Sequence, residues 1–179
     1  EVVFTAIQKN CYALGYASDT LKDNQNFMLA VIKHNSWSLQ YASDRLKNKI
    51  EMALAAVQNK GSSLRFASKD LQNDPKVVLT AVKKNGSALK FASAALKNNE
   101  DVVLAATTKN GKALKYASDR LIKDKRFLFT VVTENGLAFE FIPEELKNNE
   151  EIASAAIQQE GIMLRYIPKA LREKKGFML

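Results

Sequence analysis

A repeat of 25 residues constrains the fold of this 179-residue chain more than any other feature of its sequence. Steps of 25 residues from Leu21 always meet a leucine, and steps of 25 residues from Tyr16 always meet an aromatic residue. The leucines are Leu21, Leu46, Leu71, Leu96, Leu121, Leu146 and Leu171, and the aromatic residues are Tyr16, Tyr41, Phe66, Phe91, Tyr116, Phe141 and Tyr166. Periods of roughly 20–50 residues are typical of units that stack in a line and share one continuous core.

The period divides the chain into seven units without an insertion. The units are residues 1–25, 26–50, 51–75, 76–100, 101–125, 126–150 and 151–175, and an eighth begins at 176–179. We expect these units to form one continuous helical-repeat domain over residues 1–179. Because the sequence does not begin with methionine, we also expect it to be a fragment of a longer protein.

The first part of each unit is apolar at nearly every position before a polar end, as in "DVVLAATTKN" at 101–110. Ten such residues fit a buried strand or a helix. The bounding residues favour a helix, because Asp74 before Pro75 is typical of an N-cap followed by proline at the first helical position. Asn85-Gly86 indicates a C-terminal cap in which the glycine takes the left-handed conformation.

The second part of each unit is amphipathic, as in "GKALKYASDRLIKD" at 111–124. The serine that follows the aromatic-alanine pair is replaced by Pro143 and Pro168 in the last two units. Proline is tolerated at the start of a helix and breaks its interior. We therefore predict that the second helix ends near Tyr116-Ala117 and that a short extra turn follows through Leu121.

These patterns predict an all-α fold, a right- or left-handed α-solenoid (superhelix) of seven 25-residue repeats. Each repeat is predicted to be a helix pair plus a short extra turn. A helix pair of this length cannot bury its apolar face alone, so neighbouring units have to cover it.

Two stretches carry a resemblance to a known family: "VVLTAVKKNGSALKFASAALKNN" at 77–99 and "VVLAATTKNGKALKYASDRLIKD" at 102–124. They resemble the bacterial helical repeat catalogued as domain of unknown function family 4116. The resemblance covers the whole chain and is closest over residues 52–125. It implies large bacterial proteins, including candidate secreted effectors of intracellular pathogens, and it implies no activity or catalytic residue. Cys11 and Ser36 at the glycine position, and Pro143 and Pro168 at the serine position, depart from the family pattern.

Composition narrows the classes of function. The sequence has no apolar run long enough for a membrane span and no visible signal peptide. It holds one cysteine, Cys11, and one histidine, His34, so no intrachain disulfide forms and little remains for nucleophilic or metal chemistry. We predict no enzyme activity, no cofactor and no metal site, and a soluble protein in a reducing compartment. That compartment is the bacterial cytoplasm, or the host cytosol if the protein is a secreted effector.

The net charge of +8 is concentrated in the first five units. Residues 1–125 have a net charge of +9, residues 126–150 of −3 and residues 151–179 of +2. Arg65, Lys90 and Lys115 recur at one repeat spacing, and Lys84, Lys109 and Lys112 join them. This basic row fits contact with phosphates or with an acidic partner. It also fits a solvated face, and it is interrupted at Glu140.

A second candidate binding feature is the variable position that follows the glycine. It holds Tyr12 and Trp37 in the first two units, and such aromatic residues are enriched at binding hot spots. The alternative is that both rings pack against the next repeat or a preceding domain. Asn10, Asn35, Asn85, Asn110 and Asn135 are interpreted as C-terminal caps. His34 is interpreted as an exposed side chain and Cys11 as an unreactive one.

Three functions follow from these patterns. The first is a non-catalytic scaffold for a protein partner, with Tyr12, Trp37, Arg65, Lys90, Lys112 and Lys115 as candidate contacts. The second is nucleic-acid or acidic-surface binding through the basic face of residues 1–125, and the third is a structural or regulatory arm for a catalytic domain outside these residues. Apolar Phe4, Phe177 and Met178 at the two ends also predict end-to-end self-association.

Overall fold

The computed structural model describes residues 5, 7, 10–174 and 176–177. In this part of the chain, the second to seventh units each contribute a ten-residue α-helix, as their apolar first parts predict. These helices are α3 (Gln25–His34), α5 (Ile50–Asn59), α6 (Pro75–Lys84), α8 (Glu100–Lys109), α10 (Lys125–Glu134) and α12 (Glu150–Gln159). The predicted start of α6 is confirmed, because the Asp74 side chain accepts a hydrogen bond from the Val77 N–H and Pro75 opens the helix.

The second part of each unit is a six-residue 3-10 helix, where the sequence predicts an ordinary helix. These elements are η1 (Cys11–Tyr16), η2 (Ser36–Tyr41), η3 (Gly61–Phe66), η5 (Gly86–Phe91), η6 (Gly111–Tyr116), η7 (Gly136–Phe141) and η8 (Gly161–Tyr166). The predicted end at Tyr116-Ala117 is correct, because η6 ends at Tyr116 and Ala117 is extended.

The predicted short turn through the leucine is also confirmed. The short elements are α2 (Asp19–Lys22), α4 (Asp44–Lys47), η4 (Leu71–Asn73), α7 (Ala94–Lys97), α9 (Asp119–Lys123), α11 (Glu144–Lys147) and α13 (Lys169–Arg172). The repeating leucine of each unit lies in one of them. It is buried at Leu46, Leu71, Leu96, Leu121 and Leu171, and half-buried at Leu21 and Leu146.

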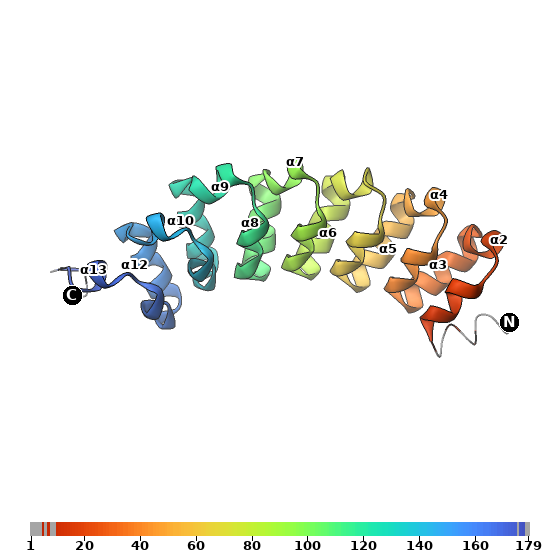
Figure 1. The fold of residues 1–179 in the computed structure, drawn as a ribbon, viewed down its shortest axis with the longest axis horizontal. Coiled ribbons are helices and arrows are strands. Elements are labelled where there is room, and N and C mark those ends of the chain that lie inside the picture. The colour runs from red at the N-terminus through yellow and green to blue at the C-terminus, as the bar shows by residue number, and fades with distance from the viewer. Residues whose placement is uncertain (1–4, 6, 8–9, 175, 178–179) are drawn as a thin grey trace.

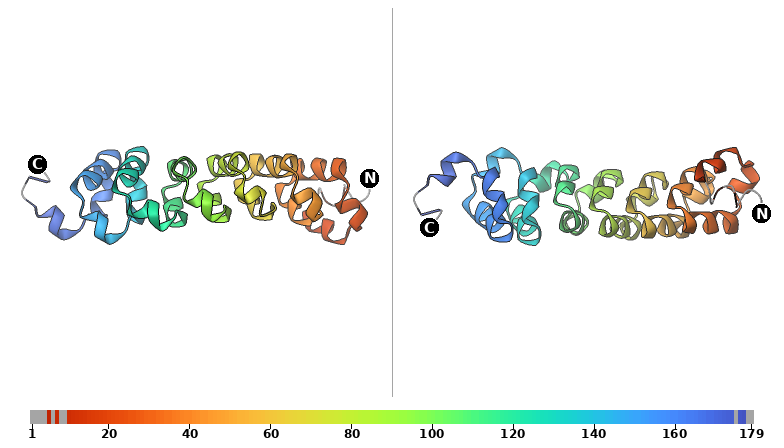
Figure 2. Two further views of the ribbon diagram at one scale, coloured as in Figure 1. Left: turned by 90° about the horizontal axis from the view of Figure 1, so that it is seen from above. Right: turned by 90° about the horizontal axis from the view of Figure 1, so that it is seen from below.

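The helices stack into an elongated solenoid with the chain termini at opposite ends (Figure 1). The ten-residue helices stand side by side in one layer, and the 3-10 helices form a second layer along the same axis (Figure 2). The core lies between the layers, where Val78 and Val82 of α6 and Leu89 of η5 are fully buried. Burying one such side chain stabilises the fold by about 1.5–3 kcal/mol, so each unit depends on the neighbour that covers it.

The repeating asparagine ends the α-helix before it, as predicted, and its side chain also caps the 3-10 helix that follows it. Asn85 is extended, and its Oδ1 accepts a hydrogen bond from the Ser87 N–H at 3.1 Å, at the start of η5. The asparagines that cap 3-10 helices in this way are Asn10, Asn35, Asn85, Asn110 and Asn135. One residue therefore ends the α-helix, through its N–H to the Ala81 carbonyl in this unit, and also begins the next helix.

The repeating glycine is required by close packing, and the predicted left-handed conformation is wrong. Within the described residues only Gly176 has a positive φ. A Cβ added to Gly86 would lie 2.2 Å from the Ala106 carbonyl oxygen of the next unit, and the same holds for Gly61 and Ala81. The glycines therefore let the 3-10 helix of one unit touch the α-helix backbone of the next.

A repeating serine connects neighbouring units by hydrogen bonds. Ser93 caps α7, donates its N–H to the Gln72 carbonyl at 2.9 Å, and donates its hydroxyl to Asn73 Oδ1 at 2.6 Å. Ser43, Ser68 and Ser118 make the equivalent pairs of bonds to the preceding unit. These bonds hold the short elements in register along one edge of the solenoid.

At the first of these junctions the acceptor is a carboxylate, Asp23, where the later ones have asparagine. The side chains of Arg45 and Ser43 donate hydrogen bonds to Asp23 and lower its pKa below the usual value, against a smaller opposing effect of burial. Arg45 also donates to the Asp23 carbonyl at 2.8 Å.

The last two junctions lack the serine bonds, because Pro143 and Pro168 have neither an N–H nor a hydroxyl. The stacking also changes at the first of them. A Cβ added to Gly111 would meet the backbone of Ala138 in η7, at 2.6 Å from its nitrogen, and not the carbonyl of α10. Asn135 Nδ2 instead bridges the units by donating to the Thr107 carbonyl at 2.9 Å.

The apolar ends predicted to drive self-association fall mainly outside the described residues, since Phe4 and Met178 are not among them. Phe177 is half-buried and packs against the core. At the C-terminal end Gly161 has nothing within 4 Å of an added Cβ, in contrast to the glycines inside the stack.

Candidate functional site

The predicted basic row is divided between the two layers. Arg65, Lys90 and Lys115 lie on the 3-10 helices and stack over aromatic rings, whereas Lys84 and Lys109 are the last residues of α6 and α8. The Arg65 guanidinium lies 4.9 Å from the ring centroid of Phe66 and 6.0 Å from that of Phe91. Lys90 Nζ lies 5.5 Å from the Phe91 centroid, and Lys115 Nζ lies 4.8 Å from that of Phe141. Cation–π attraction orients these otherwise flexible side chains.

The rings beneath these cations are half-buried, although the sequence places the aromatic position in the core. Phe66, Phe91 and Phe141 pack on the core with one part and remain accessible with the other. The cations lie over these rings, while part of Phe91 remains accessible beside Lys90.

Between the third and fourth units the row widens into a cavity of about 510 Å³, here called the basic cavity. Its charged lining residues are Arg65, Lys69, Lys90 and Lys97, and Gln72 and Ser93 contribute polar groups. None of the described lining residues is acidic. Among the described ion pairs, none joins these four cations to a carboxylate.

Four polar residues of this cavity were not predicted from the sequence: Lys69, Gln72, Ser93 and Lys97. The sequence signal that could have identified Lys69 and Lys97 lies in the short elements that contain the repeating leucine. Asp19, Asp44, Asp119 and Glu144 share one position of the repeat, and the third unit has Lys69 there while the fourth has Ala94. The carboxylate of the first, second, fifth and sixth units is therefore missing in both units that line the cavity, and it is also replaced in the seventh unit, by Lys169.

The two predicted aromatic residues have different surroundings. Tyr12 is 58% exposed in η1. Trp37 is half-buried in η2, and its ring lies edge-on to Phe66 of the next unit with centroids 6.2 Å apart. Lys60 Nζ lies 4.6 Å from the Trp37 centroid, so this ring contacts the next repeat, the alternative arrangement for the pair, and still lies at the surface. Lys112, also predicted, is exposed in η6.

Cys11 and His34 line one shallow cavity of about 480 Å³ together with Trp37 and Lys60. Cys11 is half-buried and His34 is exposed. Over the described residues, no group of three histidine, cysteine, aspartate or glutamate side chains is placed to hold a metal ion.

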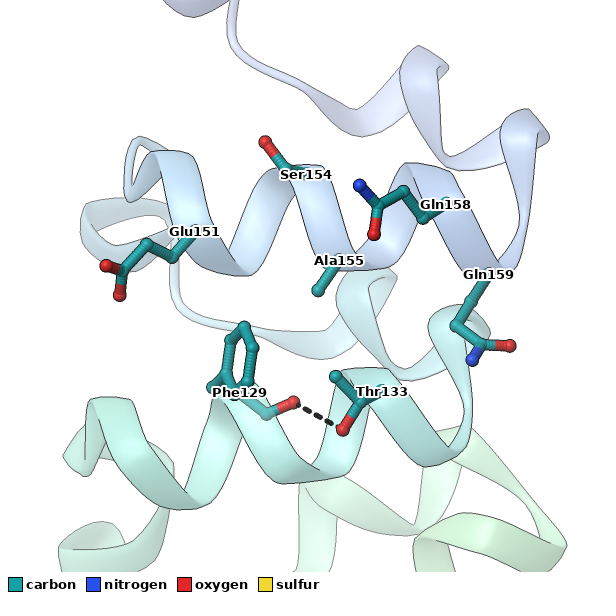
Figure 3. Close-up of a pocket in the computed structure, with 7 residues that line it drawn as sticks. All are labelled: Phe129, Thr133, Glu151, Ser154, Ala155, Gln158 and Gln159. Carbon is teal, nitrogen blue, oxygen red and sulfur yellow. Dashed lines mark hydrogen bonds between the residues drawn. The ribbon is translucent and has the colours of Figure 1, made fainter.

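A groove of about 600 Å³ lies on the opposite layer, between α10 and α12 (Figure 3). Phe129 points from α10 toward α12 and Ala155 points back toward α10, while Glu151 and Gln159 lie at the two ends. The equivalent groove 50 residues earlier is lined by Leu104 and Ala105, with Lys83 and Lys109 at its rim. These grooves recur because adjacent ten-residue helices leave the same furrow, so they are a consequence of the stacking.

The stacked units and the charged 3-10 layer define a helical-repeat solenoid protein with a basic cavity between its third and fourth units. A family model described as a domain of unknown function (DUF4116) matches residues 1–47, 24–72, 74–122 and 124–172. The matches cover most of the chain, and each spans nearly two of the 25-residue units, so the chain belongs to this family. Comparisons with curated proteins and with solved structures found no match. None of the described helices combines the length and apolar character needed to cross a bilayer.

Proposed function

We propose that this chain is a non-catalytic repeat scaffold that binds an acidic segment of a partner protein along its layer of 3-10 helices. The observation that supports the proposal is the basic cavity, where four cations converge without an acidic lining residue. Unpaired cations in one concave site attract and orient an anionic partner. Arg65, Lys90 and Lys115 extend the same charge along the solenoid at the repeat spacing.

The covered aromatic rings favour a protein over a nucleic acid. Proteins that bind single strands stack bases on open aromatic faces. Here Arg65 and Lys90 already lie over the half-buried rings of Phe66 and Phe91. An extended acidic peptide needs no open ring and can pair its carboxylates with the cations.

Binding of a labelled glutamate-rich peptide tests the proposal against its alternatives. We expect the peptide to bind the intact chain, and the double variant Arg65→Glu and Lys90→Glu to lose that binding. The matched control is Lys33→Glu with Lys76→Glu, which makes the same change in net charge at two exposed positions of α3 and α6. This control variant should bind like the unaltered protein.

Binding of labelled DNA and RNA, measured in the same way, tests the nucleic-acid alternative. Tighter binding of either than of the peptide, with a steep dependence on salt, would replace the proposal with nucleic-acid binding. If neither the peptide nor the nucleic acids bind at low salt, the chain is a structural or regulatory arm.

The single Cys11 and the family resemblance support a reducing compartment. We propose that this compartment is the bacterial cytoplasm or, for a secreted effector, the host cytosol.

A further inference from the structure

The short elements of the other units show which ion pairs are absent from the basic cavity. In the first, second and sixth units, a lysine of the short helix pairs with the carboxylate three residues before it. These pairs are Lys22–Asp19 at 3.9 Å, Lys47–Asp44 at 3.6 Å and Lys147–Glu144 at 2.6 Å. In the third unit Lys69 takes the place of the carboxylate, and in the fourth Ala94 leaves Lys97 without this partner. Lys69 and Lys97, one from each of these two units, line the same cavity.

Gln72 shows how the third unit keeps its local structure with an altered charge. In the first unit Lys22 Nζ donates to the Gly15 carbonyl at 2.9 Å. Gln72, at the same repeat position and 7% exposed, donates through Nε2 to the carbonyls of Leu64, Arg65 and Ala67 at 3.0–3.3 Å. Its Oε1 accepts a hydrogen bond from Lys69 Nζ at 3.2 Å. Gln72 therefore keeps the contact to the backbone and positions Lys69 beside the cavity.

We infer that the basic cavity binds a phosphate monoester, carried by a phosphoserine or phosphothreonine of the partner protein. This inference rests on the proposed function and specifies its ligand. A carboxylate offers one negative charge, whereas a phosphate monoester carries about −1.5 to −2 and three strong acceptor oxygens. Four cations around one cavity of about 510 Å³ match the second group better.

Arg65 has the geometry to grip such a group. Its guanidinium is held between the rings of Phe66 and Phe91, which limits its freedom and leaves its N–H groups to bind the ligand. A planar guanidinium fork matches two phosphate oxygens at once, and Lys69, Lys90 and Lys97 act as point charges around them. A nucleic-acid phosphodiester carries a single charge and is spread along a strand, so it matches a convergent site less well.

Three versions of one acidic peptide, with serine, glutamate or phosphoserine at the centre, test the ligand. With the unaltered protein we expect phosphoserine to bind at least about tenfold more tightly than serine or glutamate, because charge-assisted hydrogen bonds are added. Inorganic phosphate should compete only at far higher concentration, since it lacks the peptide contacts.

The double variant Lys69→Asp and Gln72→Lys gives the third unit the residues of the second unit, which the fold already accommodates. It should reduce the preference for phosphoserine to about twofold or less while binding of the serine peptide changes little. Lys76→Gln, which makes the same change in net charge on α6, should keep the full preference.

The outcomes separate the two proposals. Equal binding of the three peptides to the unaltered protein, or a full preference in the double variant, overturns the phosphate inference and leaves the acidic scaffold standing. Failure of all three peptides to bind overturns both. Competition by inorganic phosphate at the same concentration as the phosphopeptide would identify a site for free phosphate.

Discussion

The junctions between the first five units and those of the last two use different polar contacts along one continuous apolar core. Ser43, Ser68, Ser93 and Ser118 each donate two hydrogen bonds to the preceding unit. Pro143 and Pro168 donate none. The buried seam continues through both regions, because Leu89 and Phe139 at equivalent positions are both fully buried. The apolar seam therefore makes the stack, and the serine bonds set the register of one edge.

The same boundary separates two charge environments. The chain changes there from a net charge of +9 over residues 1–125 to −3 over residues 126–150. The packing changes with it, since Gly111 approaches η7 where Gly61 and Gly86 approach the following α-helix. The basic cavity lies in the regular, serine-linked region, where both units that line it are held by these bonds.

The largest expected difference in the free energy of unfolding is between variants of two leucines 50 residues apart. Leu96 is buried in the serine-linked region, and Leu146 is half-buried in the proline region. Leu96→Ala should lower the free energy of unfolding by about 2–5 kcal/mol, because it removes buried methyl groups and leaves a cavity. Leu146→Ala should cost clearly less. Urea denaturation followed by circular dichroism measures both, and equal losses would show that the two regions are equally well packed.

The glycines provide the next contrast. Gly86→Ala places a Cβ 2.2 Å from the Ala106 carbonyl oxygen, so the units have to separate, at a cost of about 1–3 kcal/mol. Gly161→Ala meets nothing within 4 Å and should change stability by less than about 0.5 kcal/mol. Thermal unfolding of the two variants compares them. A tolerated alanine at position 86 would contradict the close approach of neighbouring units.

A serine junction can be converted into a proline junction. The φ of Ser118 is −68°, which proline accepts, so Ser118→Pro does not strain the backbone. It removes the N–H bond to the Lys97 carbonyl, the hydroxyl bond to Asn98 and the cap that the hydroxyl provides to the Leu121 N–H. We expect a loss of about 1–3 kcal/mol for these bonds together. Ser118→Ala keeps the N–H and should lose less. Equal losses would assign the whole effect to the hydroxyl.

The smallest expected effect concerns pH and the first junction. The pKa of Asp23 is lowered in the folded state, so its stabilising contribution is present above the unfolded pKa of about 3.9 and is lost as pH falls through the lower folded value. Arg45→Gln should raise the pKa of Asp23 toward the usual value, as an NMR titration of its carboxyl carbon would show. An unchanged pKa would mean that Ser43 alone sets it.

Much of the fold was predictable because buried positions repeat. The leucine series and the apolar first part of each unit identified the core, and the prolines placed the end of the second helix. The 3-10 character of η6 was missed, since the spacing of Ala113, Leu114 and Tyr116 over six residues fits both kinds of helix. The glycine was misinterpreted because Asn-Gly also occurs at left-handed caps, and the approach of the Ala106 carbonyl to Gly86 exists only in the stacked structure.

The candidate site was predictable in part. Arg65 and Lys90 were predicted because they continue a series. Lys69 and Lys97 were missed, although the loss of the carboxylate at 69 and 94 is visible when the short elements are compared between units. The role of Gln72 could not be predicted, because its three backbone acceptors come together only through the turn that follows η3.

One residue, such as Asn85 or Asn110, separates each ten-residue helix from the 3-10 helix after it. An inserted or deleted residue inside a helix turns everything beyond it by about 100°, because an α-helix completes a turn in 3.6 residues. A connection of one residue is too short to compensate for such a rotation. Proteins of this design therefore lengthen or shorten by whole modules, and the distance between any two ligand groups that they span changes only in fixed increments.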